Sequence, residues 1–270
     1  MIRRPPHGSA EASAIAAAAI CFGVMIVAAL AWLIDERLLP GASVWAKPMK
    51  FGLSFGVDLV TLVWLATLLD DGTRDSRLAR TALVTAAAAA ALEVLYVALQ
   101  AARGRASHFN TETPLEAFLY YQVMGGAALL IVAATFAIGF MNWRHGHASV
   151  GPGQRLGAAL GAMVGSLAPL ATAGVLAAGV VDGPGHWVGG ERTDAHGLAV
   201  LGWATRGGDL RVPHFFATHL TQALPLAGLI ADHIAAKRAR PVVVAATVLG
   251  LALTGGTFWQ AASGRPFIGG

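Results

Sequence analysis

Three side chains that could carry chemistry lie inside stretches that are otherwise strongly apolar: Asp58, Glu93 and His219. An ionisable group in hydrocarbon is costly unless it is partnered, so by default it marks a functional site. We therefore name Asp58, Glu93 and His219 as candidate catalytic residues. The structural alternative for the two acids is simple pairing with a neighbouring helix, in which case neither takes part in chemistry.

Polar residues in two of these stretches follow the three- and four-residue spacings that define one face of a helix. The first stripe consists of Lys50, Ser54, Asp58 and Thr61. The second stripe consists of Glu93, Tyr96, Gln100 and Arg103. Two separate helices are thus expected to turn a polar face toward the same interior.

The stretch 207–222 joins a glycine turn to an apolar helix that carries polar groups. Pro213 suits the first turn of that helix, because its missing N–H would have no intrahelical partner there. Asp209 and Arg211 then lie at the mouth of a site, and His219 and Gln222 lie deeper. We expect this stretch to form one wall and the rim of the site.

The composition places these elements in a membrane. The chain is 56% hydrophobic and 13% charged, with a mean hydropathy of +0.61, whereas soluble domains are about a quarter charged. Its net charge of +4 comes from short basic clusters between apolar runs, a pattern typical of topology signals and not of nucleic-acid binding. The single cysteine, Cys21, excludes an internal disulfide and a paired-thiol redox relay.

Seven apolar segments each approach the roughly 20 residues that a helix needs to cross a bilayer. They cover about residues 12–34, 48–69, 80–102, 114–141, 156–180, 213–236 and 241–262. We predict an all-α membrane protein, a seven-transmembrane-helix bundle that forms a single domain over residues 1–270. The connection 182–212 is the one long loop, and loops of that length are usually functional or disordered.

Ten of the 19 Lys and Arg residues flank these segments on one side: Arg3, Arg4, Arg74, Arg77, Arg80, Arg144, Arg155, Lys237, Arg238 and Arg240. Three of the other nine, Arg192, Arg206 and Arg211, lie in the long connection or at its end, and long loops carry less weight in topology. The positive-inside rule makes the side of the first ten cytoplasmic. We expect the N-terminus inside, the C-terminus and the loop 182–212 outside, and location in the cell membrane. The first segment exceeds a signal-peptide core in length, so we expect it to be retained, with cleavage near Ala31 as the alternative.

Depth within the bilayer is uneven for the polar groups. A rise of about 1.5 Å per residue puts Asp58 and Glu93 about 15 Å from the outer end of their helices. Acidic, amide and imidazole groups gather in the outer half, which predicts a polar cavity open to the outside with the loop 182–212 as its lid. The candidate ligand-binding residues are Lys47, Lys50, Arg103, Gln122, Asp209, Arg211 and Gln222. For the glutamines, hydrogen bonding between helices is the structural alternative.

The histidines of this region raise the question of a metal. His214 and His219 are five residues apart, about 140° on an ideal helix, so they do not form the i, i+4 pair of a helical metal site. A shared ion would need His108 as well. We name His108, His214 and His219 as candidate metal ligands, for either a transition metal or the axial positions of a haem.

Three blocks of the chain contain distinctive motifs. They are Trp45-x-Lys47-Pro48-x-Lys50-Phe51, Arg103-Gly104-x-x-Ser107-His108-Phe109-Asn110-x-x-Thr113-Pro114, and Gly207-Gly208-Asp209-Leu210-Arg211-Val212-Pro213-His214-Phe215 followed by His219 and Gln222. Together they resemble a family of uncharacterised bacterial multi-pass membrane proteins over about residues 45–230. The resemblance implies a topology and no activity.

Three functions remain open. The first is a haem- or metal-dependent membrane redox protein, the second a transporter or receptor for a small solute or protons, and the third an enzyme acting on lipid headgroups or isoprenoids. The expected partners are the bilayer and a small-molecule or lipid ligand. A retinal protein is excluded because the last two segments hold no internal lysine, and no rhomboid-type serine motif, Walker motif or Rossmann fingerprint is present.

Overall fold

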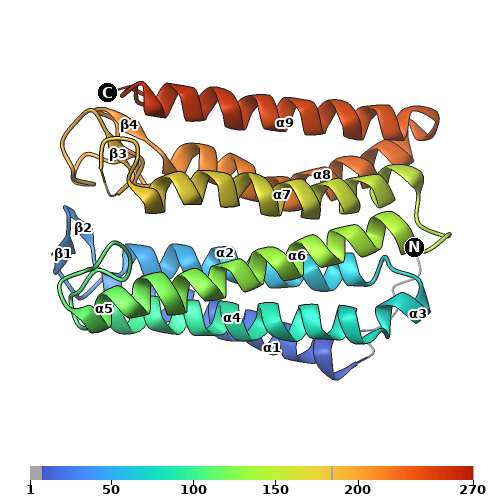
Figure 1. The fold of residues 1–270 in the computed structure, drawn as a ribbon, viewed down its shortest axis with the longest axis horizontal. Coiled ribbons are helices and arrows are strands. Elements are labelled where there is room, and N and C mark those ends of the chain that lie inside the picture. Colours follow the sequence, from blue (N-terminus) through green and yellow to red (C-terminus); the bar gives the residue numbers. More distant parts are fainter. Residues whose placement is uncertain (1–7, 184, 270) are drawn as a thin grey trace.

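The computed structural model describes residues 8–183 and 185–269, and helices dominate it (Figure 1). The long helices are α1 (Ser9–Trp32), α2 (Ala46–Ala66), α4 (Arg77–Ala102), α6 (Gly125–His145), α7 (Pro152–Ala178), α8 (Arg211–Ile234) and α9 (Ala239–Ala262). They occupy the seven ranges expected from the sequence.

Short elements complete the described chain. They are the α-helices α3 (Asp71–Arg74) and α5 (Pro114–Phe118), the π-helix η1 (Leu119–Met124) and the 3₁₀-helix η2 (Ala236–Arg238). Two antiparallel strand pairs join β1 (Leu38–Leu39) to β2 (Ala42–Ser43) and β3 (Trp187–Val188) to β4 (Gly208–Asp209). The π-helix was not expected from the sequence.

Six helical stretches of the described chain are long and apolar enough to cross a membrane: 9–32, 46–66, 77–102, 114–145, 152–178 and 236–262. The architecture is therefore that of a helical multi-pass membrane protein. Helix α8 is as long as α1 but is not among the six, because it carries Arg211, three histidines, Gln222 and Asp232 within 24 residues. The expected seventh crossing depends on this helix.

The helices form two groups (Figure 1). Helices α1, α2, α4 and α6 pack together, and α7, α8 and α9 pack together. Helix α6 lies against α7, and α2 touches α8 only lightly. Because successive helices run in opposite directions, the connections 33–45, 103–113 and 179–210 gather at one end, which we call the loop end, together with the end of α9. Figure 1 shows α6 and α7 close together at the opposite end and apart at the loop end.

Small side chains draw the first group together. Ala10, Ala14, Ala17 and Ala18 of α1 are buried in a core that also contains the alanine face of α4. A Cβ added at Gly52 or Gly56 of α2 would collide with Cys21 or Phe22 of α1. These close approaches bring α2 against α1 through one face and leave the opposite face of α2 for other contacts.

The second group relies on glycine as well. Gly157, Gly161 and Gly165 of α7 lie directly against α8, so their four-residue spacing serves helix packing. The Asp232 carboxylate of α8 accepts hydrogen bonds of 2.8 Å from the N–H groups of Gly153 and Gln154 at the start of α7. Asp232 of α8 therefore caps the N-terminus of α7.

Replacing Gly157 with alanine tests the contact between α7 and α8. The new Cβ would collide with the Leu224 carbonyl oxygen, so we expect a loss of roughly 1–3 kcal/mol, the usual range for overpacking. The control is Gly174→Ala on the same helix, where the added Cβ meets no atom within 4 Å. Thermal unfolding in detergent should show a lower midpoint for Gly157→Ala alone; equal midpoints would contradict this packing.

Candidate functional site

The polar faces of α2 and α8 run from the loop end into the bundle and meet at Thr61 and Gln222. The α2 residues Lys50 and Thr61 lie on the face opposite Gly52 and Gly56, and so point away from α1. On α8, Gln222 points away from α7, and its Nε2 donates to Thr61 Oγ1 over 3.4 Å. Residues that are far apart in the sequence thus lie side by side where the two helix groups face each other.

Two lysines of α2 dominate this face. Lys50 Nζ donates to the Leu201 carbonyl oxygen over 3.1 Å, and Lys47 Nζ lies 5.5 Å from the centroid of the Phe51 ring. Both lysines are half-buried. Within the described chain neither ammonium has a carboxylate at ion-pair distance, so two positive charges sit in a partly dry place without a direct counter-ion.

The two intramembrane acids are also without hydrogen bonds to any residue that the structure describes. Glu93 of α4 is 3% exposed. The positive charge of Lys47 interacts with the Glu93 carboxyl group. Asp58 of α2 is half-buried. Among the described residues, Asn142 Oδ1 is the one side-chain nitrogen or oxygen atom that is fully enclosed and has no hydrogen-bond partner. The Glu93 oxygens, which also lack a partner, are therefore not fully enclosed. A buried carboxylate in this situation is a candidate proton acceptor.

Aromatic rings surround Lys47 and His108. The His108 ring lies 5.4 Å from the Phe51 ring and 5.6 Å from the Tyr120 ring, between centroids. Burial, helped by the nearby charge of Lys47, holds the pKa of His108 well below its usual value, so this imidazole is neutral at neutral pH. Tyr120 belongs to the π-helix η1, and such single-turn insertions often occur at functional sites.

Part of the long loop is tied to the start of α8 by a group of ionisable residues that we call the loop clamp: His186, Asp194, Asp209 and Arg211. Arg211 donates to Asp194 Oδ1 over 2.8 Å, to Asp209 Oδ2 over 2.6 Å and to the Gly202 carbonyl oxygen over 2.6 Å. Asp209 also accepts from the Ala204 N–H over 2.9 Å. In the clamp, Asp209 and Arg211 pair with each other. The loop that they hold lies over the face of α2 that carries Lys47 and Lys50, which we call the lysine face.

Electrostatics stabilise this clamp. Burial alone would raise the pKa of the Asp194 carboxyl, but the hydrogen bond with His186 and the charge of Arg211 outweigh burial and lower it to about 2. Burial lowers the pKa of His186, although its contact with Asp194, 3.3 Å between Nε2 and Oδ1, acts in the opposite direction. Near neutral pH Asp194 is therefore a carboxylate, Arg211 a guanidinium and His186 a neutral imidazole.

The three histidines named as metal ligands do not come together. His214 Nδ1 lies 3.0 Å from Thr172 Oγ1, on the α7 side of α8. His219 is exposed on another face of α8, with Nδ1 2.7 Å from the Phe215 carbonyl oxygen. His108 lies against α2. In the part of the chain that is described, no three His, Cys, Asp or Glu side chains are placed to hold a metal ion.

The remaining named residues have separate positions. Arg103 is exposed and donates to Gln100 Oε1 over 2.8 Å, and Gln122 is exposed on η1. Sequence reasoning overlooked Asp194 and His186, although both lie in the loop that it singled out. It also missed the ion pair of Arg105 with Glu116, 2.6 Å long, at the start of α5, where Thr113 Oγ1 accepts from the Glu116 N–H.

Comparison with known proteins gives no match: no family model, no curated protein and no solved structure is similar to this chain. The resemblance of the three sequence blocks therefore gains no support from outside the chain. Any functional assignment must rest on its own residues.

The loop clamp can be tested with Asp194→Asn. This change removes the negative charge shared by Arg211 and His186, and we expect the segment 185–209 to open more easily by roughly 1.5–3 kcal/mol, the range for hydrogen bonds to charged groups. Amide hydrogen exchange measures this opening. Glu191→Gln, an exposed acid in the same loop, is the control; faster exchange in both variants, or in neither, would contradict the clamp.

Acid should loosen the loops at the same end. The folded pKa values of His108 and His186 lie below the usual 6.5, so the unfolded segments bind more protons once the pH drops below about 6.5. Their stabilising contribution is complete above that pH and declines below it. Asp194 adds a further loss only as the pH falls below its usual 3.8 toward about 2.

We expect hydrogen exchange in the segments 104–113 and 185–209 to accelerate between about pH 7 and about pH 5, after correction for the intrinsic rate. The connection 146–151 at the other end serves as the internal reference. Corrected rates that stay constant in all three segments would show that burial of these imidazoles does not stabilise the loops.

Proposed function

We propose that this protein is a seven-helix membrane protein that binds an anionic group, a phosphate or a carboxylate, on the lysine face of α2 at the loop end. The observation that carries this proposal is the pair Lys47 and Lys50, half-buried and without a carboxylate partner among the described residues. Two ammonium groups one helical turn apart match an anion with several oxygen atoms. The loop clamp lies over this position and would act as its lid.

Helix α8 completes the bundle in this proposal. Its 24 residues span about 36 Å at a rise of about 1.5 Å each, enough to cross the hydrocarbon core. Its polar residues Arg211 and Gln222 face α2, which accounts for a lower hydropathy than that of the other long helices. The loop end would then face the outside, as the distribution of basic residues indicates.

The site is polar at one end only, which favours a receptor or a lipid-headgroup enzyme over a transporter. The polar contacts between α2 and α8 end at Thr61 and Gln222. Farther from the loop end α8 exposes apolar residues such as Leu226 and Ile230, until His233 in its last turn. A path through the membrane would need polar groups along its whole length.

Glu93 and Asp58 would serve as proton acceptors beside the bound anion. A carboxylate near an anion is unfavourable while both are charged, so binding would favour protonation of Glu93. His219 lies outside this group on the exposed face of α8. The redox alternative needs His108, His214 and His219 to share a metal or a haem, and these three side chains contact different parts of the molecule.

The double variant Lys47→Ala, Lys50→Ala tests the proposal. Binding is measured as thermal stabilisation of the purified protein by inorganic phosphate, citrate and a short-chain phosphatidic acid. We expect at least one of these anions to stabilise the wild type, and the double variant to bind it at least tenfold more weakly, a cost of about 1.4 kcal/mol. Stabilisation by phosphatidic acid alone would identify a lipid ligand, and stabilisation by the small anions a soluble one.

Two controls accompany this experiment. Lys237→Ala removes an exposed lysine at the opposite end and should leave binding unchanged. Lys47→Arg with Lys50→Arg retains the charges and should retain most of the affinity. Equal stabilisation of the wild type and the double alanine variant, or no stabilisation by any of the three anions, would refute the lysine face as an anion site.

A further inference from the structure

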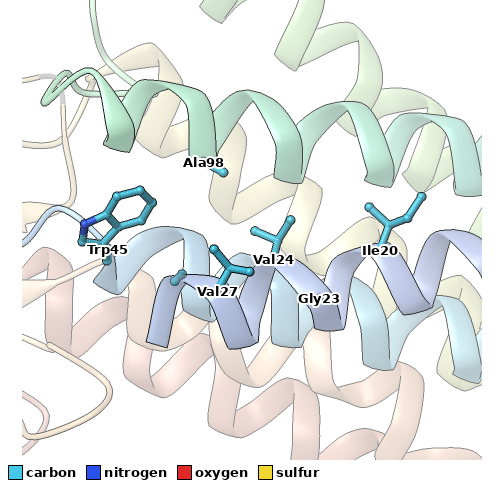
Figure 2. Close-up of a pocket in the computed structure, with 7 residues that line it drawn as sticks. Ile20, Gly23, Val24, Val27, Trp45 and Ala98 are labelled. Carbon is cyan, nitrogen blue, oxygen red and sulfur yellow. The ribbon is translucent and has the colours of Figure 1, made fainter. Parts of the chain in front are cut away.

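A second site lies on the other side of α2, away from the two lysines. It is a cavity of about 310 Å³ between α1, the start of α2 and α4. Figure 2 shows the side chains of Ile20, Val24 and Val27 pointing from α1 toward α4, where Ala98 lies, with the Trp45 ring at one end of the cavity.

The cavity exists because α1 and α4 pack closely over only half of their length. The buried residues of α1 are concentrated between Ala10 and Cys21, and beyond Cys21 only Ala28 is buried. Small residues at Gly23, Ala28 and Ala98 line the cavity and leave it unfilled. A Cβ added at Gly23 would meet no atom within 4 Å, so this space is open and not merely loosely packed.

The chemistry of the lining selects a hydrocarbon. Every residue around the cavity is apolar except Trp45, and the Trp45 indole N–H already donates to Asp35 Oδ2 over 2.7 Å. A polar ligand would find no free partner there, and water is disfavoured in an apolar cavity. Val27, Leu30 and Leu99 nearby are 57–61% exposed, so the cavity borders the surface that faces the bilayer. An acyl chain inserted here would gain dispersion contacts on several sides.

A charged pair lies next to the Trp45 end. Arg37 donates to Asp35 Oδ2 over 2.6 Å and, through Nη1, to the carbonyl oxygen of Ala102 at the end of α4. Its side chain remains 49% exposed, against 20% for Asp35. A guanidinium is well suited to a phosphate, and the adjacent carboxylate is suited to an ammonium group. The two charges together complement a zwitterionic headgroup.

We infer that this cavity binds one acyl chain of a zwitterionic phospholipid, with its phosphate beside Arg37 and its ammonium group beside Asp35. Trp45 lies where the chain meets the headgroup, the interfacial depth that tryptophan prefers in membrane proteins. The site is separate from the lysine face of α2, so it stands whether or not that face binds an anion.

Gly23→Leu tests the inference. The added Cβ meets no atom within 4 Å and the rest of the leucine side chain would occupy the cavity, so the variant should fold and melt no lower than the wild type, while the acyl chain would be displaced. The protein is placed in nanodiscs of equal parts phosphatidylethanolamine and phosphatidylglycerol, extracted into detergent and analysed by native mass spectrometry. The wild type should retain one phosphatidylethanolamine per chain, and Gly23→Leu at least tenfold less.

The matched control is Gly255→Leu, the same change in open space on the exposed face of α9, which should retain the lipid. Asp35→Asn, which removes the carboxylate assigned to the ammonium group, should lose the preference for phosphatidylethanolamine over phosphatidylglycerol while keeping an acyl chain in place. The inference is overturned if the wild type retains no lipid, if Gly23→Leu retains as much as Gly255→Leu, or if phosphatidylglycerol is retained preferentially by the wild type.

Discussion

The cost of leaving a polar group unpartnered in hydrocarbon is the constraint on which this structure depends. Helix α8 carries Arg211, His214 and Gln222, too many polar side chains for a helix surrounded by lipid. It becomes compatible with a membrane because two of these side chains have hydrogen-bond partners on neighbouring helices. His214 pairs with Thr172 of α7, and Gln222 pairs with Thr61 of α2. The two helix groups meet mainly where α6 packs on α7, and the Gln222–Thr61 contact adds a polar link between them.

Small residues allow these contacts to form. Glycines on α7 and α2 let helices approach until backbones touch, which gives each group a fixed face toward its neighbour. Small side chains also leave space elsewhere. Helix α1 packs tightly on α4 through alanines and then separates from it around Gly23. Close packing and the apolar cavity are two outcomes of one composition.

The loop end differs from the rest because its polar groups are partnered by one another and not by helix packing. Arg211 brings Asp194 and Asp209 together across the long loop, and His108 is enclosed by aromatic rings. Lys47, Lys50 and Glu93 stay outside these pairings. The groups that a ligand could engage are those that the protein has not already neutralised, and the long loop reaches Lys50 among them through the Leu201 carbonyl oxygen.

Composition and helical periodicity alone determined much of this protein: its membrane class, the positions of the long helices, and the polar faces of α2 and α4. These features are local, because hydropathy and a 3.6-residue repeat act within one helix. The orientation and the seventh crossing remain predictions. The tertiary structure alone decided which polar groups become partners, since that depends on contacts between distant segments. The sequence analysis grouped His214 with His219, but the fold turns them apart, because side chains five residues apart on a helix point in different directions. It left out Asp194, which the fold brings to Arg211, because a long loop can fold back onto the helix that follows it.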